Sequence, residues 1–215
     1  MAKAPISGTV KTRLVPPLTH EQAAALSHAL LLDQFEHLAQ MDGADLYVAF
    51  TPADAAPSMT GLLSARFQCF PQRGENLGER MNEVFVELHR RTHRNLIAIG
   101  SDVPAVPLLY LEDAFRLLAD ENNRVVLGPS RDGGYYLIGM NQPIPEIFKD
   151  MTWSHDQVLA QTTEKLSQLD LQFALLPVWF DLDRIEDLDR LQTLADPGVR
   201  HAMRRTMALL QQLNR

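Results

Sequence analysis

The chain has 215 residues, a formal net charge of −7 and 46% apolar residues, so we expect a single domain with its own core over residues 1–215. The acidic balance argues against general nucleic acid binding, which needs a dominant basic surface. No uncharged apolar run approaches the roughly 20 residues of a membrane span, and the N-terminus lacks the apolar core of a signal peptide, so we expect a cytoplasmic protein with neither nucleic acid nor a membrane among its partners.

A basic loop opens the chain. The first 18 residues contain Lys3, Lys11 and Arg13 and no acidic residue, and glycine and proline interrupt them. Such a stretch at the head of an acidic protein predicts a loop that binds a polyanion, above all a di- or triphosphate. It is not a P-loop, because Val10 precedes Lys11 where that motif requires glycine.

From residue 20 onward, predicted helices and strands alternate, beginning with a helix at 20–41 for which Thr19 is a suitable cap. The predicted strands cover 44–51, 66–70, 95–102, 124–130, 135–140 and 173–183. The other predicted helices cover 54–65, 81–93, 108–121, 153–169 (with Ser154 as N-cap), 185–195 and 199–213. This order predicts an α/β fold, a three-layer α/β/α sandwich with a mostly parallel sheet. The short link 131–134 predicts one antiparallel strand, hence a mixed sheet.

Carboxylates follow two of the predicted strands. Ligands of open α/β sheets bind at the carboxyl ends of the strands, where Asp102 ends one strand and Asp181 and Asp183 end another. Asp102 with one of the later pair would suit Mg²⁺, which prefers oxygen ligands and often keeps phosphate oxygens in its shell. The alternative is that Asp102 caps the next helix or closes a turn, and the sequence pattern favours neither reading.

The string GPSRDGGYYLIG at 128–139 contains a predicted tight turn, Asp132-Gly133-Gly134. Its exposed backbone N–H groups would suit an anionic or polar ligand. Asp-Gly is also a strong hairpin signal by itself. Periodicity does not separate these two readings.

Several strings occur together and in order: AKAPISGTVKTRL, NLGERM, GSDVP, GPSRDGGYYLIG, WS followed by VL, and DLDRIEDL. With them the chain resembles the small bacterial glycosyltransferase-A-like transferases of the radical-SAM/selenodomain-associated type, in the nucleotide-diphospho-sugar transferase superfamily. The resemblance implies a Rossmann-like, GT-A-type mixed sheet. Members of that family have an apolar strand directly before the basic loop, where this chain has only Met1 and Ala2, so we expect a truncated first strand.

The resemblance also implies roles for single residues. A divalent metal, Mg²⁺ or Mn²⁺, would bind Asp102 and Asp183, and Asp132 would position the acceptor or act as a base. The nucleotide would contact Lys3, Gly8, Lys11, Arg13 and Arg80, and the acceptor would contact Gly133, Gly134 and Ser154.

These expectations describe a metal-dependent transferase with a nucleotide-activated donor and a small-molecule acceptor. The family favours glycosyl transfer from a sugar nucleotide, whereas the basic loop suits nucleotidyl transfer from a nucleoside triphosphate equally well. A nucleotide-binding module without catalysis is the alternative from another class. In the C-terminal helix 199–213, Met203, Met207, Leu210 and Leu213 form one apolar stripe that predicts packing on the domain or on a second subunit, as in a homodimer.

Overall fold

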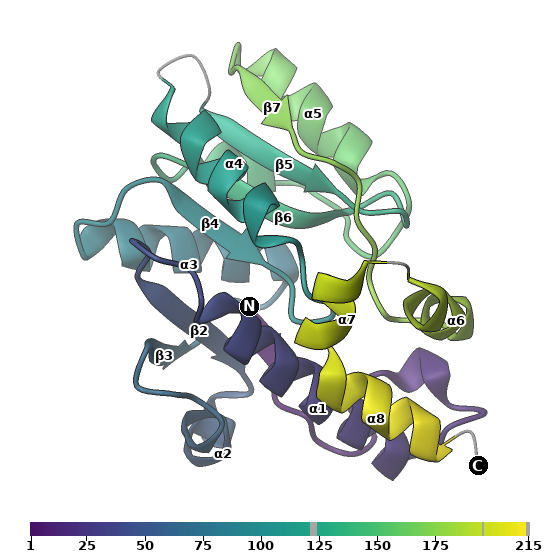
Figure 1. The fold of residues 1–215 in the computed structure, drawn as a ribbon. Helices are drawn as coiled ribbons and strands as arrows, with labels where there is room; N and C mark the ends of the chain where they lie inside the picture. The colour runs from purple at the N-terminus through teal and green to yellow at the C-terminus, as the bar shows by residue number, and fades with distance from the viewer. Residues whose placement is uncertain (121–123, 195, 214–215) are drawn as a thin grey trace. The chain divides into compact units, whose positions relative to one another are not determined.

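A computed structural model describes residues 1–120, 124–194 and 196–213 (Figure 1). The chain forms two compact units, which we describe separately. Unit 1 consists of Met1–Pro71, Ser101–Pro107 and Asp181–Arg215, and unit 2 of Gln72–Gly100 and Leu108–Phe180. The last residues of the predicted helices 108–121 and 185–195 lie outside the described residues. The expectation of a single domain stays a prediction.

Unit 1 contains a parallel sheet of three strands in the order β1-β2-β3. Strand β1 covers Ala2–Lys3, β2 covers Leu46–Thr51 and β3 covers Phe67–Pro71. The expected truncated first strand is thus a two-residue strand, in which Ala2 lies opposite Phe50 of β2. Apolar side chains of the central strand β2 are buried against α1 and α2 and form the core of this unit.

The helices of unit 1 begin with α1, whose predicted cap is confirmed. The Thr19 hydroxyl accepts the Gln22 N–H at 3.2 Å, and the Gln22 side chain accepts the Thr19 N–H at 2.8 Å. The helical elements of this unit are η1 (Thr12–Leu14), α1 (His20–Leu38), η2 (Ala53–Ala55), α2 (Ala56–Gly61), α6 (Ile185–Thr193), α7 (Pro197–Ala202) and α8 (Arg204–Leu213).

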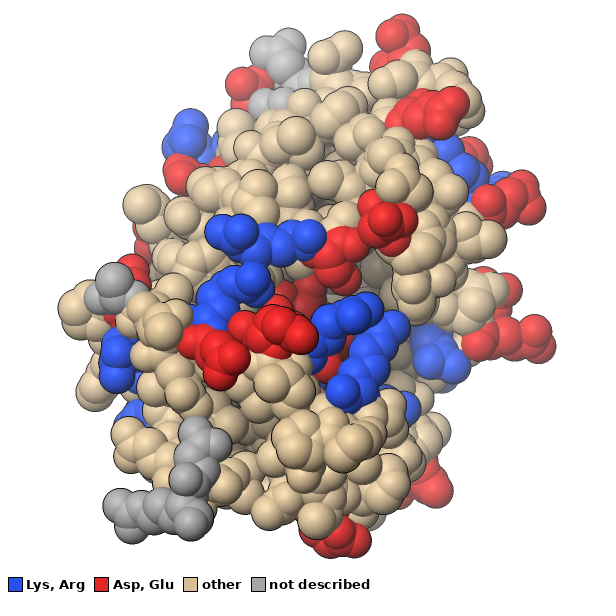
Figure 2. Space-filling view, turned by 90° about the vertical axis from the view of Figure 1, so that its right-hand side faces the viewer, with Lys and Arg blue, Asp and Glu red and all other residues tan. Residues whose placement is uncertain are grey.

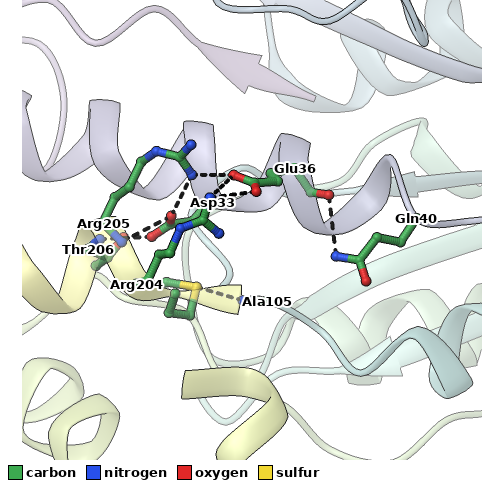
Figure 3. Close-up of polar contacts among 8 residues, drawn as sticks. Asp33, Glu36, Gln40, Ala105, Arg204, Arg205 and Thr206 are labelled. Atoms are coloured by element: carbon green, nitrogen blue, oxygen red, sulfur yellow. Dashed lines mark hydrogen bonds and ion pairs between the residues drawn. The ribbon is translucent and has the colours of Figure 1, made fainter. Parts of the chain in front are cut away.

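The prediction of one C-terminal helix over 199–213 is wrong, because this segment forms two helices, α7 and α8. The buried carboxylate of Asp33 in α1 accepts the N–H of Arg205 at 3.2 Å and of Thr206 at 2.8 Å, so a new helix begins there (Figure 3). Helix α8 packs along α1 with Leu210 buried. Met203, which ends α7, is also buried, whereas Met207 and Leu213 are half-buried. Two members of the predicted apolar stripe are thus buried within this chain, and the homodimer stays a prediction.

Unit 2 contains a mixed sheet in the order β4-β6-β5-β7. Strand β6 runs antiparallel to both β4 and β5, whereas β5 and β7 are parallel, so the predicted antiparallel strand is confirmed. The strands are β4 (Leu96–Ile99), β5 (Val125–Pro129), β6 (Tyr135–Met140) and β7 (Phe173–Leu175). The last strand is much shorter than the predicted 173–183, because Pro177, which has no N–H, interrupts the ladder. Pairing resumes beyond it as an isolated parallel bridge between Ser130 and Trp179.

The helices of unit 2 are α3 (Leu77–Arg90), α4 (Leu108–Ala119), η3 (Pro145–Phe148) and α5 (Val158–Gln168). The prediction that Ser154 caps a helix at 153–169 is wrong. Ser154 has a left-handed backbone (φ 68°), and the helix begins only after Gln157. Close packing of the segment 153–157 against α3 and the β5–β6 turn, described below, excludes the helical conformation there.

The predicted α/β fold class with mixed, mostly parallel strands is confirmed, but the strands form two sheets, one in each unit, in place of the single sheet that the sequence pattern predicts. Among the described residues, we find no helix with the length and apolar character that crossing a bilayer requires.

Candidate functional site

The side chain of Lys11 is the centre of a charged cluster in unit 1. Lys11 precedes the short helix η1 and has a left-handed backbone, with φ at 50°. Val10 and Leu14, on either side, are buried and hold this part of the loop against the unit. The Lys11 side chain is only 1% exposed, so its ammonium group depends on protein partners.

Two carboxylates supply those partners. The Nζ atom of Lys11 contacts an oxygen of Asp102 and lies 3.2 Å from Oδ1 of Asp183. A guanidinium nitrogen of Arg13 lies 3.7 Å from the other oxygen of Asp183. Of the pair Asp181 and Asp183, it is thus Asp183 that faces the basic loop. The side chain of Asp102 is 51% exposed and that of Asp183 is 36% exposed, so water reaches both acids.

The electrostatics of Lys11 follow from this arrangement. Burial would lower the pKa of Lys11, but the charges and hydrogen bonds of Asp102 and Asp183 outweigh burial and raise the pKa above its ordinary value. Lys11 is therefore a fixed cation at neutral pH. The amino group of Met1 is different, because burial lowers its pKa to about 6 and the charge of Asp102 only partly opposes this.

The segment Ser101–Pro107 carries Asp102 and is held within unit 1. The Leu182 N–H donates to the Asp102 carbonyl at 2.9 Å, which joins this segment to the one that carries Asp183. From α1, Gln34 donates to the Val103 carbonyl at 3.3 Å and His37 contacts the Val106 carbonyl at 2.7 Å. Helix α4 begins only at Leu108, so Asp102 is not its N-cap.

The contact of His37 predicts a pH dependence. Burial lowers the pKa of His37 below 6.5, against the weaker effect of its bond to the Val106 carbonyl. The unfolded chain therefore takes up this proton first, and we expect the unfolding free energy to fall as pH drops from about 7.5 through 6.5 to about 5.5. In His37→Gln, which cannot titrate, urea titrations at these pH values should give a flatter profile. An unchanged slope would contradict the assignment to His37.

Asp187 holds the backbone of Asp183. Its carboxylate accepts the N–H of Asp183 at 3.1 Å and of Arg184 at 2.8 Å, at the start of α6, and pairs with Arg190 at 2.8 Å. Asp187 thus caps α6 and orients Asp183 through its backbone.

Replacing Asp187 by alanine should lower the unfolding free energy by about 1 kcal/mol, the usual cost of a lost helix cap. Urea denaturation followed by circular dichroism would measure this. Asp189→Ala is the matched control, because Asp189 is an exposed carboxylate of the same helix whose recorded hydrogen bond uses only its backbone carbonyl. Equal losses in both variants would count against the capping role.

Lys3 and Gly8 shape the rest of the basic loop. The Lys3 ammonium donates to the Thr9 carbonyl at 2.7 Å and so crosses the loop. Gly8 has φ at 78°, a conformation that glycine adopts without strain, and a Cβ there would meet no neighbouring atom. The loop therefore has an open surface at Gly8.

The remaining predicted site residues lie in unit 2. Asp132, Gly133 and Gly134 form the β5–β6 turn, in which Asp132 Oδ1 accepts the Gly134 N–H at 3.0 Å. The turn is a hairpin connection, as one of the two sequence interpretations expected. A hydrogen bond also joins the turn to α5, since the Gly133 carbonyl accepts the Leu159 N–H at 2.9 Å.

The segment 153–157 joins two of the motif strings. Gly133 has φ at 88°, and a Cβ on it would overlap the backbone carbonyl of Asp156. On the other side, a Cβ on Gly78 of α3 would lie 2.8 Å from the Trp153 ring. The strings NLGERM, DGG and WS thus meet at this segment, which the sequence alone did not reveal. Ser154 lies in the segment and is exposed.

Arg80, in α3, lies against the turn that precedes its own helix. Its guanidinium donates to the carbonyls of Gly74 at 3.0 Å and Glu75 at 3.3 Å. These bonds explain how the side chain is held and do not test its predicted contact with a nucleotide.

The comparisons with known proteins identify the family. Residues 32–155 match a family described as an uncharacterized protein conserved in bacteria, DUF2064. The chain belongs to the DUF2064 family. No curated protein gives a significant match to this DUF2064 member.

Among solved structures, 12 chains match this DUF2064 protein. One is a crystal structure at 1.90 Å from Desulfovibrio desulfuricans G20, provisionally assigned as a nucleotide-diphospho-sugar transferase, with 30% identity and a TM-score of 0.86 over 98% of this chain and 94% of that chain. The similarity supports the predicted superfamily, and the radical-SAM/selenodomain-associated type stays a prediction. The DUF2064 match includes Asp102 and Asp132 but neither Lys11 nor Asp183.

The charges of this DUF2064 protein are mixed on the face drawn in Figure 2. Lys and Arg side chains lie next to Asp and Glu side chains there, without one large basic area.

Proposed function

We propose that this protein is a metal-dependent transferase that uses a nucleotide-activated donor and transfers a sugar from a sugar nucleotide to a small acceptor. The observation that carries the proposal is the cluster of Lys11 and Arg13 with Asp102 and Asp183 in unit 1. Cations beside a pair of carboxylates are what a diphosphate with a divalent metal requires. The similarity to the Desulfovibrio protein supports the same donor class.

The donor set fits Mg²⁺ or Mn²⁺. Asp102 and Asp183 offer carboxylate oxygens that already surround one cationic atom, and both side chains reach solvent. Among residues 1–120, 124–194 and 196–213, no three His, Cys, Asp or Glu side chains form a closed metal cage. Two carboxylates with water and phosphate oxygens would therefore complete the shell, as is usual for Mg²⁺. The bound metal would stabilise negative charge on the departing nucleoside diphosphate.

The protein's own groups would act on the two substrates separately. Lys11 and Arg13 would bind the diphosphate, and Lys3, Gly8 and Arg80 would contact the nucleotide. Asp132 would orient the acceptor hydroxyl and act as its base. Gly133, Gly134 and Ser154 would contact the acceptor.

A thermal-shift panel of sugar nucleotides and nucleoside triphosphates, each with and without Mg²⁺ or Mn²⁺, tests the proposal. A ligand at about 100 times its dissociation constant adds about 2.7 kcal/mol of stability. We expect a metal-dependent shift for at least one sugar nucleotide. The proposal fails if no nucleotide shifts the wild-type protein under any metal, and a shift by triphosphates alone would favour nucleotidyl transfer instead.

Asp102→Asn should lower the affinity for the metal at least about 10-fold, which corresponds to about 1.4 kcal/mol, because the amide lacks the charge that holds a cation. The metal-dependent part of the thermal shift should shrink accordingly. Asp113→Asn is the matched control, since Asp113 lies on α4 in unit 2 and pairs with Arg116. An unchanged metal-dependent shift in Asp102→Asn would show that Asp102 is not a metal ligand.

A further inference from the structure

We propose that Lys11 is an exchangeable counter-ion, which pairs with Asp102 and Asp183 until a divalent metal and a diphosphate enter together, and then pairs with the phosphate. The proposal rests on the proposed function and specifies how its site takes up ligands. Lys11 would thus keep the metal out of the site when no donor is present.

The first step of the argument is that Lys11 and a metal need the same atoms. The Nζ atom contacts one oxygen of Asp102 and Oδ1 of Asp183, and these are the two carboxylates available to a metal. A divalent cation at those oxygens would stand beside an ammonium group, and like charges at such a distance repel each other. Metal and Lys11 therefore compete for the pair of acids.

The second step is that the buried ammonium group of Lys11 depends on Asp102 and Asp183 for its counter-charge. Its side chain is 1% exposed, and the loop on either side is held by buried Val10 and Leu14. A displaced ammonium group would remain buried without a counter-charge, which is costly. Its salt bridges within the described part of the chain are those with Asp102 and Asp183.

The third step is the charge balance. Lys11 and Arg13 balance Asp102 and Asp183, so a divalent metal alone would add two positive charges to a neutral set. The diphosphate of a sugar nucleotide restores neutrality and offers oxygens to both the metal and Lys11. Metal and diphosphate should therefore strengthen each other's binding, and by linkage the two effects are equal.

Equilibrium dialysis with Mn²⁺, alone and with inorganic pyrophosphate, tests the exchange. For the wild-type protein we expect weak binding of Mn²⁺ alone and at least ~10-fold tighter binding with pyrophosphate. Lys11→Met keeps the length of the side chain and removes its charge. This variant should bind Mn²⁺ alone at least ~10-fold more tightly than wild type does. The factor by which pyrophosphate raises its Mn²⁺ affinity should be at least ~5-fold smaller than the factor for wild type.

Lys165→Met is the matched control, because it also removes one lysine charge, but Lys165 lies on α5 in unit 2, where its ammonium group donates to the Lys149 carbonyl. Its Mn²⁺ affinity should stay within ~2-fold of wild type. Circular dichroism of Lys11→Met checks that this variant is folded. Lys11→Arg keeps the positive charge, so its Mn²⁺ binding in dialysis should stay close to that of wild type.

Unchanged or weaker Mn²⁺ binding by folded Lys11→Met would overturn the proposed exchange. The proposed function would still be supported if the wild-type protein binds Mn²⁺ together with pyrophosphate. Equal tightening in Lys165→Met would also overturn the proposed exchange, because the effect would then come from the net charge of the protein and not from Lys11. If the wild-type protein binds neither Mn²⁺ nor pyrophosphate, both proposals fail.

Discussion

Gly133→Ala is expected to lower the unfolding free energy of unit 2 by about 3 kcal/mol or more. The backbone φ of 88° is strained for any residue with a Cβ, and that Cβ would overlap the carbonyl of Asp156. The neighbour is backbone and cannot turn aside as a flexible side chain would. Relief would require the β5–β6 turn and the segment before α5 to separate, which would also move Asp132 and Ser154.

Both tryptophans of the chain, Trp153 and Trp179, lie in unit 2, so urea denaturation followed by tryptophan fluorescence would measure this loss. Gly134→Ala is the matched control. Its backbone is not left-handed, and the nearest atom to a new Cβ would be the Asp132 carboxylate at 3.2 Å, which can shift. If Gly133→Ala were no less stable than Gly134→Ala, the close packing of the turn against 153–157 would be wrong.

The second large effect is expected for Asp33→Ala in unit 1, at about 3 kcal/mol. Asp33 is fully buried and accepts the N–H groups of Arg205 and Thr206 as well as a guanidinium nitrogen of Arg205 at 3.2 Å (Figure 3). Alanine would leave the buried Thr206 N–H without its acceptor at the start of α8. The helix should then lose its attachment to α1.

Urea denaturation followed by far-UV circular dichroism would give the global loss, and hydrogen exchange over 204–213 would locate it. Glu36→Ala is the control, because Glu36 is only one turn away and pairs with Arg204 and Arg205 at 2.5 Å, but at an exposed position. Exposed ion pairs contribute below about 1 kcal/mol. A larger loss in Glu36→Ala than in Asp33→Ala would refute the anchoring role of Asp33.

Local patterns predicted the elements whose boundaries depend on neighbours in sequence. Thr19 and Gln22 cap α1 by bonds across one helical turn, and Asp132-Gly133 makes the hairpin before β6, which begins and ends where the sequence predicted. The same reasoning failed at Ser154, because the packing of Trp153 on Gly78 and of Asp156 on Gly133 excludes a helix there. It also failed at the α7–α8 break, which depends on Asp33, more than 170 residues earlier in the chain.

The sequence by itself determined the α/β class, the mixed sheet and the chemical character of the candidate site, a basic loop with carboxylates at the ends of two segments. Only the tertiary structure decided that Asp183, of the later pair, faces Lys11, and that Lys11 is buried between two acids. The physical reason is distance along the chain. Lys11 and Asp183 lie 172 residues apart, so their contact depends on how the segments that carry them pack in unit 1, and no local pattern records that packing.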